Sequence, residues 1–534
     1  MHEMNDYDRA PLLPLSVLYL LLPALLFAAG WLRPGVAAAV GIVLVAFAML
    51  LLRDLAGSLR QGQDRMAAGA GSRGGAFAWR STWPGVLVIL IWVLLSGAGG
   101  FGYQHRDHKA SNALLRDLIE EPWPLTVSTG AGQEKVVYYL AYFLPAAALG
   151  KVAGWGAANV ALFLWTLLGT LLAFGWFLRM SRRDGREAGP RPILLAALFC
   201  GAGGLDLIGA RFFQNSAIAF SSENEWWAGY FQYSSNTTLL YWVPQQAIAA
   251  WLATGLICDA ARNRDTWRYV AVTLAALVLW TPFGLVGVLP FLGLSLLEAL
   301  WRGDGPPRGL RVWMLSVAGF LLGAVHALYI ASNSLRFPAG VLWTIVDDRL
   351  VYLKYVAAFW MLEFALLVVL LLAGAATERR RPALVDQKSV PGVGSAPLDG
   401  GSRTGLSDLD LRRLLVALLV LLVLPGFTLG YYNALAMRTS IPALFVLWIS
   451  AARLVGASSA PRARTMRIIQ GLVVAILIVG MYPAAVNVNE SLAAYHFGPP
   501  DLSGVLTTAT VNRSQIVALR FGDSNAFFYR YLGR

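Results

Sequence analysis

The sequence predicts an all-α fold, a polytopic transmembrane helical bundle of about 13 spans with juxtamembrane helices on its outer side. Three observations predict this class. Of the 534 residues, 57% are hydrophobic and 14% are charged, whereas roughly a quarter of the residues in a soluble domain are charged. Apolar runs of about 20 residues, the length that crosses a bilayer, recur along the chain. Arginines gather in alternate loops, as they do on the cytoplasmic side of membrane proteins.

The candidate spans follow a short N-terminus of mixed charge, Met1 to Arg9. The first apolar stretch lacks a small-residue cleavage site, so we interpret it as a membrane anchor and not as a signal peptide. The candidate spans are Pro14–Trp31, Gly35–Leu52, Trp83–Phe101, Gly156–Leu178, Ile193–Gly209, Leu239–Cys258, Tyr269–Phe283, Leu285–Leu300, Trp313–Ala331, Leu350–Gly374, Leu414–Tyr431, Thr439–Val455 and Ile468–Val486. The two spans between Tyr269 and Leu300 are short and contain prolines.

A further apolar stretch, Val136–Gly150, is predicted not to cross the membrane. At about 1.5 Å per residue its helix would reach only roughly 22 Å. Arginine-rich loops precede Trp83–Phe101 and follow Gly156–Leu178, and both loops are cytoplasmic only if an even number of crossings separates them. We therefore expect an interfacial or re-entrant helix on the outer face, with Tyr138 and Tyr139 in its aromatic belt.

This alternation predicts the orientation of the whole chain. Residues 1–486 form the bundle, the outer loop 102–155 carries the juxtamembrane helices, and residues 487–534 form an extracytoplasmic tail. The N-terminus is cytoplasmic, and the net charge of +13 is concentrated in the inner loops. That charge is a topological signal and not a nucleic-acid footprint, so nucleic acid is excluded as a partner. The lysine-poor, Ala/Arg/Gly-rich composition favours a bacterial inner membrane, with the tail in the periplasm.

The most informative outer segment is Gly102–Asn112, which reads GYQHRDHKASN. Few polar residues of this chain could do chemistry, and several are concentrated here. We predict that Asp107 is a general base, with His108 or Arg106 in support. Lys109 beside them is a further candidate for substrate binding.

The run after this segment is predicted to be an amphipathic helix that lies along the membrane surface. Apolar residues at helical spacing oppose charged ones: Leu114, Leu115, Leu118 and Ile119 against Arg116, Asp117 and Glu120. Such a helix would hold the polar segment at the boundary of water and lipid. Two alternatives stay open, namely a solvated connecting loop and a zinc site formed by His105 and His108.

Several features of this region occur together: an acidic residue in the first large outer loop, the run EEPWPL, the run KVVYYLAYFLPAAALGKVAG and a returning span. Over roughly Trp83–Arg183 the chain thereby resembles the GT-C superfamily, integral-membrane glycosyltransferases that use polyprenyl-phosphate sugars. The resemblance implies a catalytic Asp or Glu in the loop, here Asp107, and substrate contacts near Tyr138 and Tyr139. It also implies a polyprenyl-phosphate-linked sugar donor and a glycan or lipid acceptor. The Asp-Glu or Asp-x-Asp pair that is usual in this family is absent from the loop. A divalent cation is therefore neither assigned nor excluded as a cofactor.

Other outer residues are consistent with substrate binding. Arg438 lies where a helix is predicted to begin, and a cation beside free backbone N–H groups suits a lipid-linked phosphate. The alternative is that Arg438 reaches out to the lipid headgroups. Asn433 is interpreted as a helix cap or a sugar contact. Gln245 and Gln246 enter an apolar region, where they either bond to a neighbouring helix or line a substrate cavity.

Acidic residues elsewhere have two readings each. Glu223 and Glu225 stand beside Trp226 and Trp227, a combination that suits a sugar ring, although tryptophans at an interface usually form a belt. Asp348, in an acidic pair with its predecessor, is expected to cap a helix rather than to bind a metal.

Glu363 is the deeply placed acid of the spans, and it lies too far along its helix from Lys354 to pair with it. We expect Glu363 to bond within the bundle.

Two functions are compatible with these patterns. The first is a glycosyltransferase that acts on the extracytoplasmic face, with Asp107 as the base and Arg438 on the donor phosphate. The second is a transporter or flippase for an envelope lipid or polysaccharide, a class that shows repeats, broken helices and buried charges. A scaffold for envelope assembly is a third option. The concentration of outer polar residues near one loop favours the enzyme.

Overall fold

The computed structural model describes residues 9–67, 72–129, 132–182, 191–213, 224–303, 309–333, 339–379, 406–430, 433–456, 464–511 and 520–534. Three sequence predictions fall wholly or largely outside these ranges. They concern Glu223, the end of the span Leu414–Tyr431, and most of the linker Thr377–Asp410.

The described chain is built almost entirely of helices. These are α1 (Arg9–Trp31), α2 (Pro34–Ala67), α3 (Ser72–Leu94), α4 (His108–Glu120), α5 (Leu144–Ser181), α6 (Pro192–Gly201), α7 (Asp206–Phe213), α8 (Asn236–Trp242), α9 (Pro244–Ala260), α10 (Trp267–Trp280), α11 (Pro282–Trp301), α12 (Leu310–Ala331), α13 (Leu342–Ile345), α14 (Arg349–Trp360), α15 (Leu366–Arg379), α16 (Asp408–Val423), α17 (Ala434–Thr439), α18 (Ile441–Gly456), α19 (Arg464–Gly480) and α20 (Tyr482–Ala493).

Short turns and strands complete the fold. The 3-10 turns are η2 (Ala98–Gly100), η4 (Asn224–Trp226), η5 (Arg264–Thr266), η7 (Leu424–Gly426) and η8 (Leu502–Gly504), and the π turns are η6 (Met361–Ala365) and η10 (Phe528–Leu532). The strands are β1 (Thr126–Thr129), β2 (Gly132–Val137), β3 (Ala339–Val341), β4 (Phe427–Leu429) and β5 (Arg520–Gly522). They form one antiparallel sheet in the order β1-β2-β5 and a second antiparallel pair, β3-β4.

Eight helical segments of the described chain are long and apolar enough to cross a membrane. They are Pro11–Trp31, Pro34–Gly57, Leu144–Ser181, Pro192–Phe213, Pro282–Trp301, Val312–Ala331, Arg349–Arg379 and Arg464–Ala493. In the two segments that belong to α2 and α12, most apolar side chains are exposed or only partly buried by protein, as expected for helices that face lipid. The predicted class of an α-helical membrane protein is confirmed, whereas the predicted number of about 13 spans is not.

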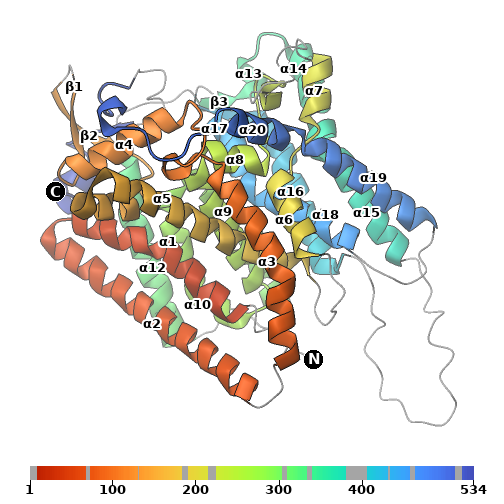
Figure 1. Cartoon of the computed structure of the whole chain (residues 1–534), viewed down its shortest axis with the longest axis horizontal. Helices are drawn as coiled ribbons and strands as arrows, with labels where there is room; N and C mark the ends of the chain where they lie inside the picture. Colours follow the sequence, from red (N-terminus) through yellow and green to blue (C-terminus); the bar gives the residue numbers. More distant parts are fainter. Residues whose placement is uncertain are drawn as a thin grey trace.

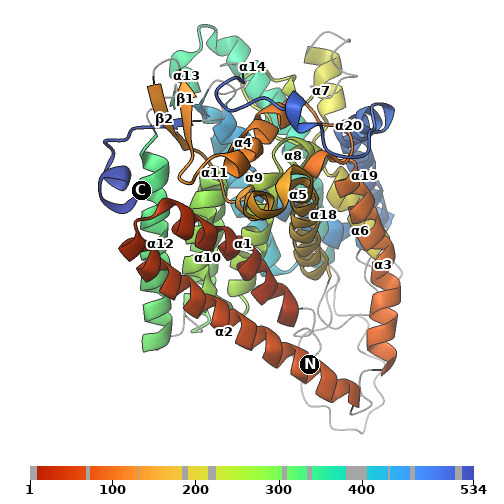
Figure 2. The ribbon, with the colours of Figure 1, turned by 60° about the vertical axis from the view of Figure 1, so that its left-hand side comes forward.

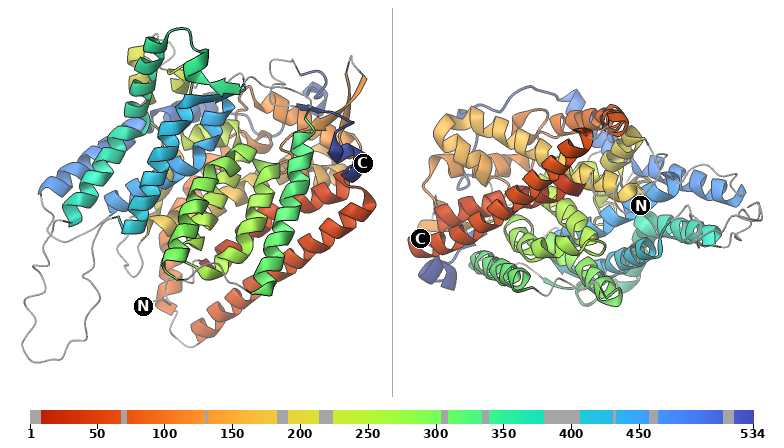
Figure 3. Two further views of the ribbon diagram at one scale, coloured as in Figure 1. Left: turned by 180° about the vertical axis from the view of Figure 1, so that it is seen from behind. Right: turned by 90° about the horizontal axis from the view of Figure 1, so that it is seen from below.

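The bundle has two chemically distinct ends. Figure 1 shows α4, α8, α17, α20 and the strands β1 to β3 together at the top, and the N-terminus at the bottom. The turned views keep the same short elements together at one end of the long helices (Figures 2 and 3). We call this end, which carries Asp107, the loop end. The opposite end is called the arginine end, because the arginines near the ends of α5, α9, α16 and α18 meet there.

The stretch Val136–Gly150 differs from its prediction. Val136 and Val137 end strand β2, residues 138–143 are not helical, and α5 starts only at Leu144. The helix then continues to Ser181, interrupted at Gly154, whose φ of 83° suits a glycine. A separate helix over Val136–Gly150 is therefore wrong. Pairing with β5, more than 380 positions later, overrides the apolar pattern of this segment.

The amphipathic helix is confirmed as α4, but its polar side is partly covered. Leu114, Leu115 and Leu118 are completely buried, as expected. Asp117, predicted to face water, is buried as well, and it accepts a hydrogen bond of 2.7 Å from the backbone N–H of Thr508. The C-terminal chain thus folds back over α4. Helix α20 also runs across the boundary predicted between residues 486 and 487.

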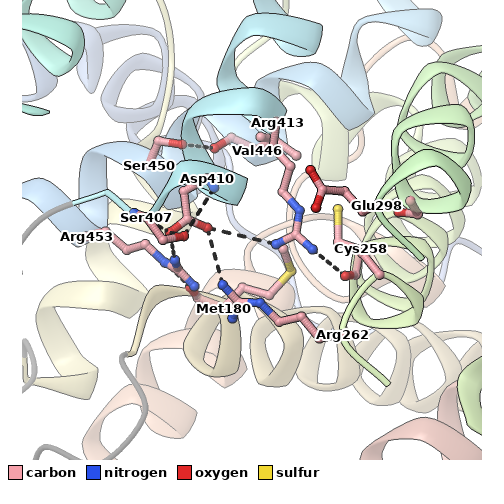
Figure 4. A network of polar contacts seen from close by, with 12 residues as sticks. Met180, Cys258, Arg262, Glu298, Ser407, Asp410, Arg413, Val446, Ser450 and Arg453 are labelled. Carbon is pink, nitrogen blue, oxygen red and sulfur yellow. Dashed lines mark hydrogen bonds and ion pairs between the residues drawn. The ribbon is translucent and has the colours of Figure 1, made fainter. Parts of the chain in front are cut away.

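Buried ion pairs hold the arginine end together (Figure 4). Asp410, in the first turn of α16, pairs with Arg453 of α18 and lies 3.7 Å from an Arg262 nitrogen and 3.9 Å from an Arg413 nitrogen. Ser407 donates its hydroxyl to the same carboxylate over 2.6 Å. Burial alone would raise the pKa of Asp410, but the three arginines and Ser407 outweigh it and lower this pKa to about 2.

We expect Asp410→Asn to destabilise the protein strongly, by about 3–5 kcal/mol, because two buried arginines lose their counter-charge. Thermal unfolding in detergent should show a lower Tm for this variant than for Asp408→Asn, whose side chain is exposed. The Asp410 carboxylate stabilises the fold fully above its ordinary pKa, and this stability is lost as the pH falls toward about 2. A Tm equal to that of Asp408→Asn would contradict the role of this network.

Candidate functional site

Asp107 stands at the start of α4 with its carboxylate free. It is the N-cap residue, yet its side chain makes no capping hydrogen bond to the helix. The loop is instead closed by its backbone, since the N–H of His108 donates to the carbonyl of His105 over 2.9 Å. Asp107 is solvent-accessible, while the leucines of α4 anchor its backbone in the core. The helix thus fixes Asp107 without using its carboxylate.

The surroundings of Asp107 suit a base. Crowding by protein atoms raises the pKa of its carboxyl above the ordinary value, even though the side chain is accessible to water. The positive charges of Arg438 and then Arg106 oppose this rise. A carboxylate with a raised pKa is a stronger base than an ordinary one.

Arg438 comes from a distant part of the chain and shares this environment. Its charge acts on both Asp107 and Tyr138, while no direct ion pair joins Arg438 to Asp107 within the described structure. The guanidinium lies 5.8 Å from the ring centre of Phe283, and its Nε is buried without a hydrogen-bond partner among the described residues. The two opposite charges are therefore near one another with a gap between them.

The local structure around Arg438 differs from the prediction. A helix was expected to begin at Arg438, but this residue lies in the last turn of the short helix α17, ahead of α18, which begins at Ile441. The free N–H groups invoked for a phosphate are thus not at Arg438 itself. At this position, the Arg438 guanidinium is therefore the group that can bind an anion.

Tyr138 and Gln245 link the outer loop to the bundle. The hydroxyl of Tyr138 is hydrogen-bonded to the side chain of Gln245, near the start of α9. Burial raises the pKa of Tyr138 to about 12, so its hydroxyl keeps its proton at neutral pH. Tyr329 of α12 fixes this point, because its hydroxyl accepts from the N–H of Tyr138 and donates to the carbonyl of Val136, each over 3.2 Å. Asp107, Tyr138, Gln245 and Arg438 consequently form one cluster.

Several buried polar atoms at the loop end have no protein partner among the described residues. Both amide atoms of Gln246, which is completely buried, are unpaired, as are Arg438 Nε and Thr439 Oγ1. Buried polar groups in proteins are nearly always hydrogen-bonded, and exceptions call for water or a ligand. Of the two alternatives for the glutamines, Gln245 bonds within the protein, whereas Gln246 retains its capacity to bind another molecule.

The two histidines of the loop are buried and neutral. Burial lowers the pKa of His105 and of His108 to about 4, and for His108 the nearby His105 adds to the effect. His105 stacks on Trp242 of α8 with ring centres 4.8 Å apart. His108 Nδ1 has no partner within the described structure. Among the described residues, no group of three or more His, Cys, Asp or Glu is arranged to hold a metal ion.

Other predicted substrate residues are placed differently. Asn433 uses its amide within the protein: its nitrogen donates to the carbonyls of Tyr230 and Phe427, and its oxygen accepts from the N–H of Leu429. The backbone φ of Asn433 is 44°, in the left-handed region that asparagine tolerates. Asn433 therefore sets the turn of the chain ahead of α17.

Glu225 and Trp227 do not form an outer sugar platform. Both are buried, and the Glu225 carboxylate accepts hydrogen bonds from Gln232, Ser235 and Thr238. Glu223 lies outside the described residues. The acidic and aromatic pattern was interpreted as a sugar contact or a membrane belt, whereas the contacts of Glu225 are internal.

The remaining predicted residues flank the cluster. Arg106 is exposed on the loop and Lys109 is exposed in the first turn of α4. Tyr139 is buried, with its ring 4.8 Å from that of Tyr138. Asp348 caps α14 as predicted, since its carboxylate accepts from the N–H groups of Leu350 and Val351.

Sequence reasoning missed the residues of α20 that support the loop. Asn487 accepts a hydrogen bond of 3.1 Å from the indole N–H of Trp242, the residue that stacks on His105. Glu490, one turn further, lies 3.9 Å from His105 Nδ1. The available signal was a pair of polar residues three positions apart at the end of an apolar run.

The fold and the site together define an α-helical membrane protein with a polar, partly unsatisfied cluster at one end. No protein-family model, curated protein or solved structure matches the chain. The cluster's own chemistry is therefore the basis for assigning a function.

Proposed function

We propose that the protein is a membrane glycosyltransferase that transfers a sugar from a polyprenyl-phosphate-linked donor to a glycan or lipid acceptor. The reaction takes place at the loop end, which faces the extracytoplasmic side of a bacterial inner membrane. The donor class rests on the GT-C-like pattern of residues 83–183, and the reaction type rests on the cluster itself.

The observation that carries the proposal is the proximity of a carboxylate and a guanidinium that form no ion pair with each other or with any other described residue. Asp107 and Arg438 act on each other electrostatically without an ion pair between them. A glycosyl transfer by direct displacement uses two such groups: a base for the acceptor hydroxyl and a cation for the leaving phosphate. A carboxylate and a guanidinium with a purely structural role would be stabilised by a direct charge-assisted hydrogen bond.

The proposed step assigns one role to each group. Asp107 takes the proton of the acceptor hydroxyl, and the acceptor oxygen forms a bond to the anomeric carbon. The bond from that carbon to the phosphate oxygen breaks, and its electron pair leaves with the polyprenyl phosphate. Arg438 stabilises the charge of the departing phosphate, while Tyr138 and Gln246 supply hydrogen bonds to the sugar and Gln245 holds the Tyr138 hydroxyl.

The assay that tests this proposal uses purified protein in lipid vesicles with polyprenyl-phosphate sugars as candidate donors. We expect release of polyprenyl phosphate together with an equal amount of glycosylated acceptor, when donor and acceptor are both present. Movement of an intact lipid-linked sugar across the bilayer, without cleavage, would instead support transport.

A transporter or flippase is the second candidate, and one observation favours it. The span Pro192–Phe213 is broken into α6 and α7 by a non-helical segment, and buried acids lie next to the break. Broken helices with buried charges are common in transporters. The enzyme remains the better proposal, because Asp107 and Arg438 lie close enough to act on each other's charge while neither forms an ion pair with a described residue.

A further inference from the structure

A second polar centre lies around the break between α6 and α7. Residues 202–205 are not helical, and the carbonyls left free at the end of α6 are taken up by α8. The Asn236 backbone N–H donates to Ala202, its side chain donates to Phe199, and Thr237 donates to Cys200, at 2.8–2.9 Å. The break is therefore a built feature of the fold, in which α8 supplies hydrogen bonds to three carbonyls next to it.

Two carboxyl groups meet at this break. Asp206 begins α7, and Glu363 projects from the π turn η6, a type of turn that often marks functional sites. The indole N–H of Trp227 lies 3.2 Å from Asp206 Oδ1 and 3.3 Å from Glu363 Oε1, so one donor is shared by both acids. The backbone N–H of Leu205 donates to the carbonyl of Leu362 and locks the two segments together.

The second oxygen of each carboxyl group has no protein donor. Asp206 Oδ2 and Glu363 Oε2 are buried and unpaired with respect to the described residues, and the two side chains are only 1% and 3% exposed. No arginine, lysine or histidine of the described chain forms an ion pair with either acid. The other titratable groups nearby are Glu225 and Tyr233, and neither carries a positive charge.

We infer that Asp206 and Glu363 bind one proton between them and form a proton-binding site embedded in the bundle. Two buried carboxylates side by side cannot both be ionised without a positive charge, and a shared proton supplies it. Their side chains are within hydrogen-bonding contact of each other, which requires a proton on one of them.

The packing favours a proton over a larger cation. A Cβ atom added to Gly204 would lie 2.0 Å from Glu363 Oε2, so this oxygen rests directly against the backbone of the break. Gly203 and Gly480 also approach each other closely, since a Cβ atom added to Gly203 would lie 2.7 Å from the Gly480 carbonyl oxygen, so the break is pressed against the end of α19. A hydrated or multiply coordinated ion needs more room than this contact leaves.

The site gives the fold a two-state element that is independent of the proposed transfer reaction. With the proton bound, α7 and η6 are held together by the carboxyl pair and Trp227. When the proton leaves, two negative charges remain in contact, and separating α7 from η6 relieves their repulsion. Glu225, whose charge acts on Asp206, begins a hydrogen-bonded series through Thr238 and Asn487 to Trp242. Trp242 in turn stacks on His105 of the loop that carries Asp107.

The test is infrared spectroscopy of the purified full-length protein in lipid, at neutral pH and without sodium. We expect a carbonyl band of a protonated carboxyl group that shifts in D₂O and is missing from the double variant Asp206→Asn/Glu363→Gln. The control Glu120→Gln removes an exposed carboxylate that pairs with Arg116, so it should leave this band unchanged. Both substitutions of the double variant are isosteric and neutral, and they imitate the protonated pair.

Equal bands in the wild type and the double variant would overturn the assignment, and so would a band that disappears when sodium is added. A second measurement does not depend on the folding of the double variant. Dicyclohexylcarbodiimide modifies protonated carboxyls in apolar surroundings, and mass spectrometry should find it on Asp206 or Glu363 of the wild type. It should not modify Glu298, which is buried but paired with arginines. Modification of Glu298 with neither Asp206 nor Glu363 modified would contradict the inference.

Discussion

Asp107→Asn is expected to reduce glycosyl transfer by about 10²- to 10⁴-fold, the usual contribution of a general base. The amide has the size and shape of the carboxyl group but cannot accept the proton of the acceptor hydroxyl. Folding should persist, because the Asp107 side chain makes no capping bond to α4 and is solvent-accessible. The measurement is product formation per folded protein in lipid vesicles, with the Tm of each variant as a control.

Two matched variants sharpen this prediction. Asp107→Glu retains a carboxylate and should keep more activity than Asp107→Asn, although its base is displaced by one methylene group. Glu120→Gln changes an exposed charge at the other end of α4 and should have little effect on the rate. Wild-type turnover by Asp107→Asn would remove Asp107 as the base.

Arg438→Ala is expected to weaken binding of the donor roughly ten- to hundredfold, the range for one charge-assisted hydrogen bond of about 1.5–3 kcal/mol. Arg438 forms no ion pair with a described residue, so the substitution leaves no buried carboxylate uncompensated at a direct contact. Binding of polyprenyl phosphate alone, measured by calorimetry in detergent, isolates the phosphate from the sugar. Unchanged affinity for polyprenyl phosphate would contradict the role of Arg438.

For Arg438→Ala we also expect a change in the pH dependence of kcat/KM. The reaction needs ionised Asp107, so activity falls as the pH drops through the pKa of this carboxyl. Crowding raises that pKa, and the charge of Arg438 opposes the rise. Removing the charge in Arg438→Ala should raise the pKa further and move the acid limb of kcat/KM to higher pH. Arg438→Lys keeps the charge, and its acid limb should stay near that of the wild type.

Local patterns predicted the parts of the fold that depend on local chemistry. The apolar runs and the amphipathic spacing of α4 identified most helices, and Asp348 was identified as a cap. Within the site, Asp107 and Arg438 stood out because each is a charged residue at a predicted loop end. Their proximity could not be derived from spacing, since they are more than 330 positions apart.

Contacts between distant segments produced the differences. Val136 and Val137 pair with a strand near the C-terminus, and Asp117 is covered by the segment around Thr508. The local sequence around Val136 and Asp117 contains no pattern that indicates these distant contacts. Glu225 was read as an outer sugar contact because it stands beside tryptophans, whereas the fold turns it inward. Glu363 was correctly expected to bond within the bundle, but its partner Asp206 was not foreseen.

Site-directed labelling at position 107 tests the proposed arrangement most directly. Asp107→Cys, in a protein whose Cys200 and Cys258 are replaced, would be treated with a membrane-impermeant maleimide on intact cells and on inverted vesicles. We expect rapid labelling from the extracytoplasmic side only, slowed by polyprenyl phosphate and not by the free lipid alcohol. Labelling from the cytoplasmic side alone, or at a rate that polyprenyl phosphate leaves unchanged, would contradict a donor site between Asp107 and Arg438.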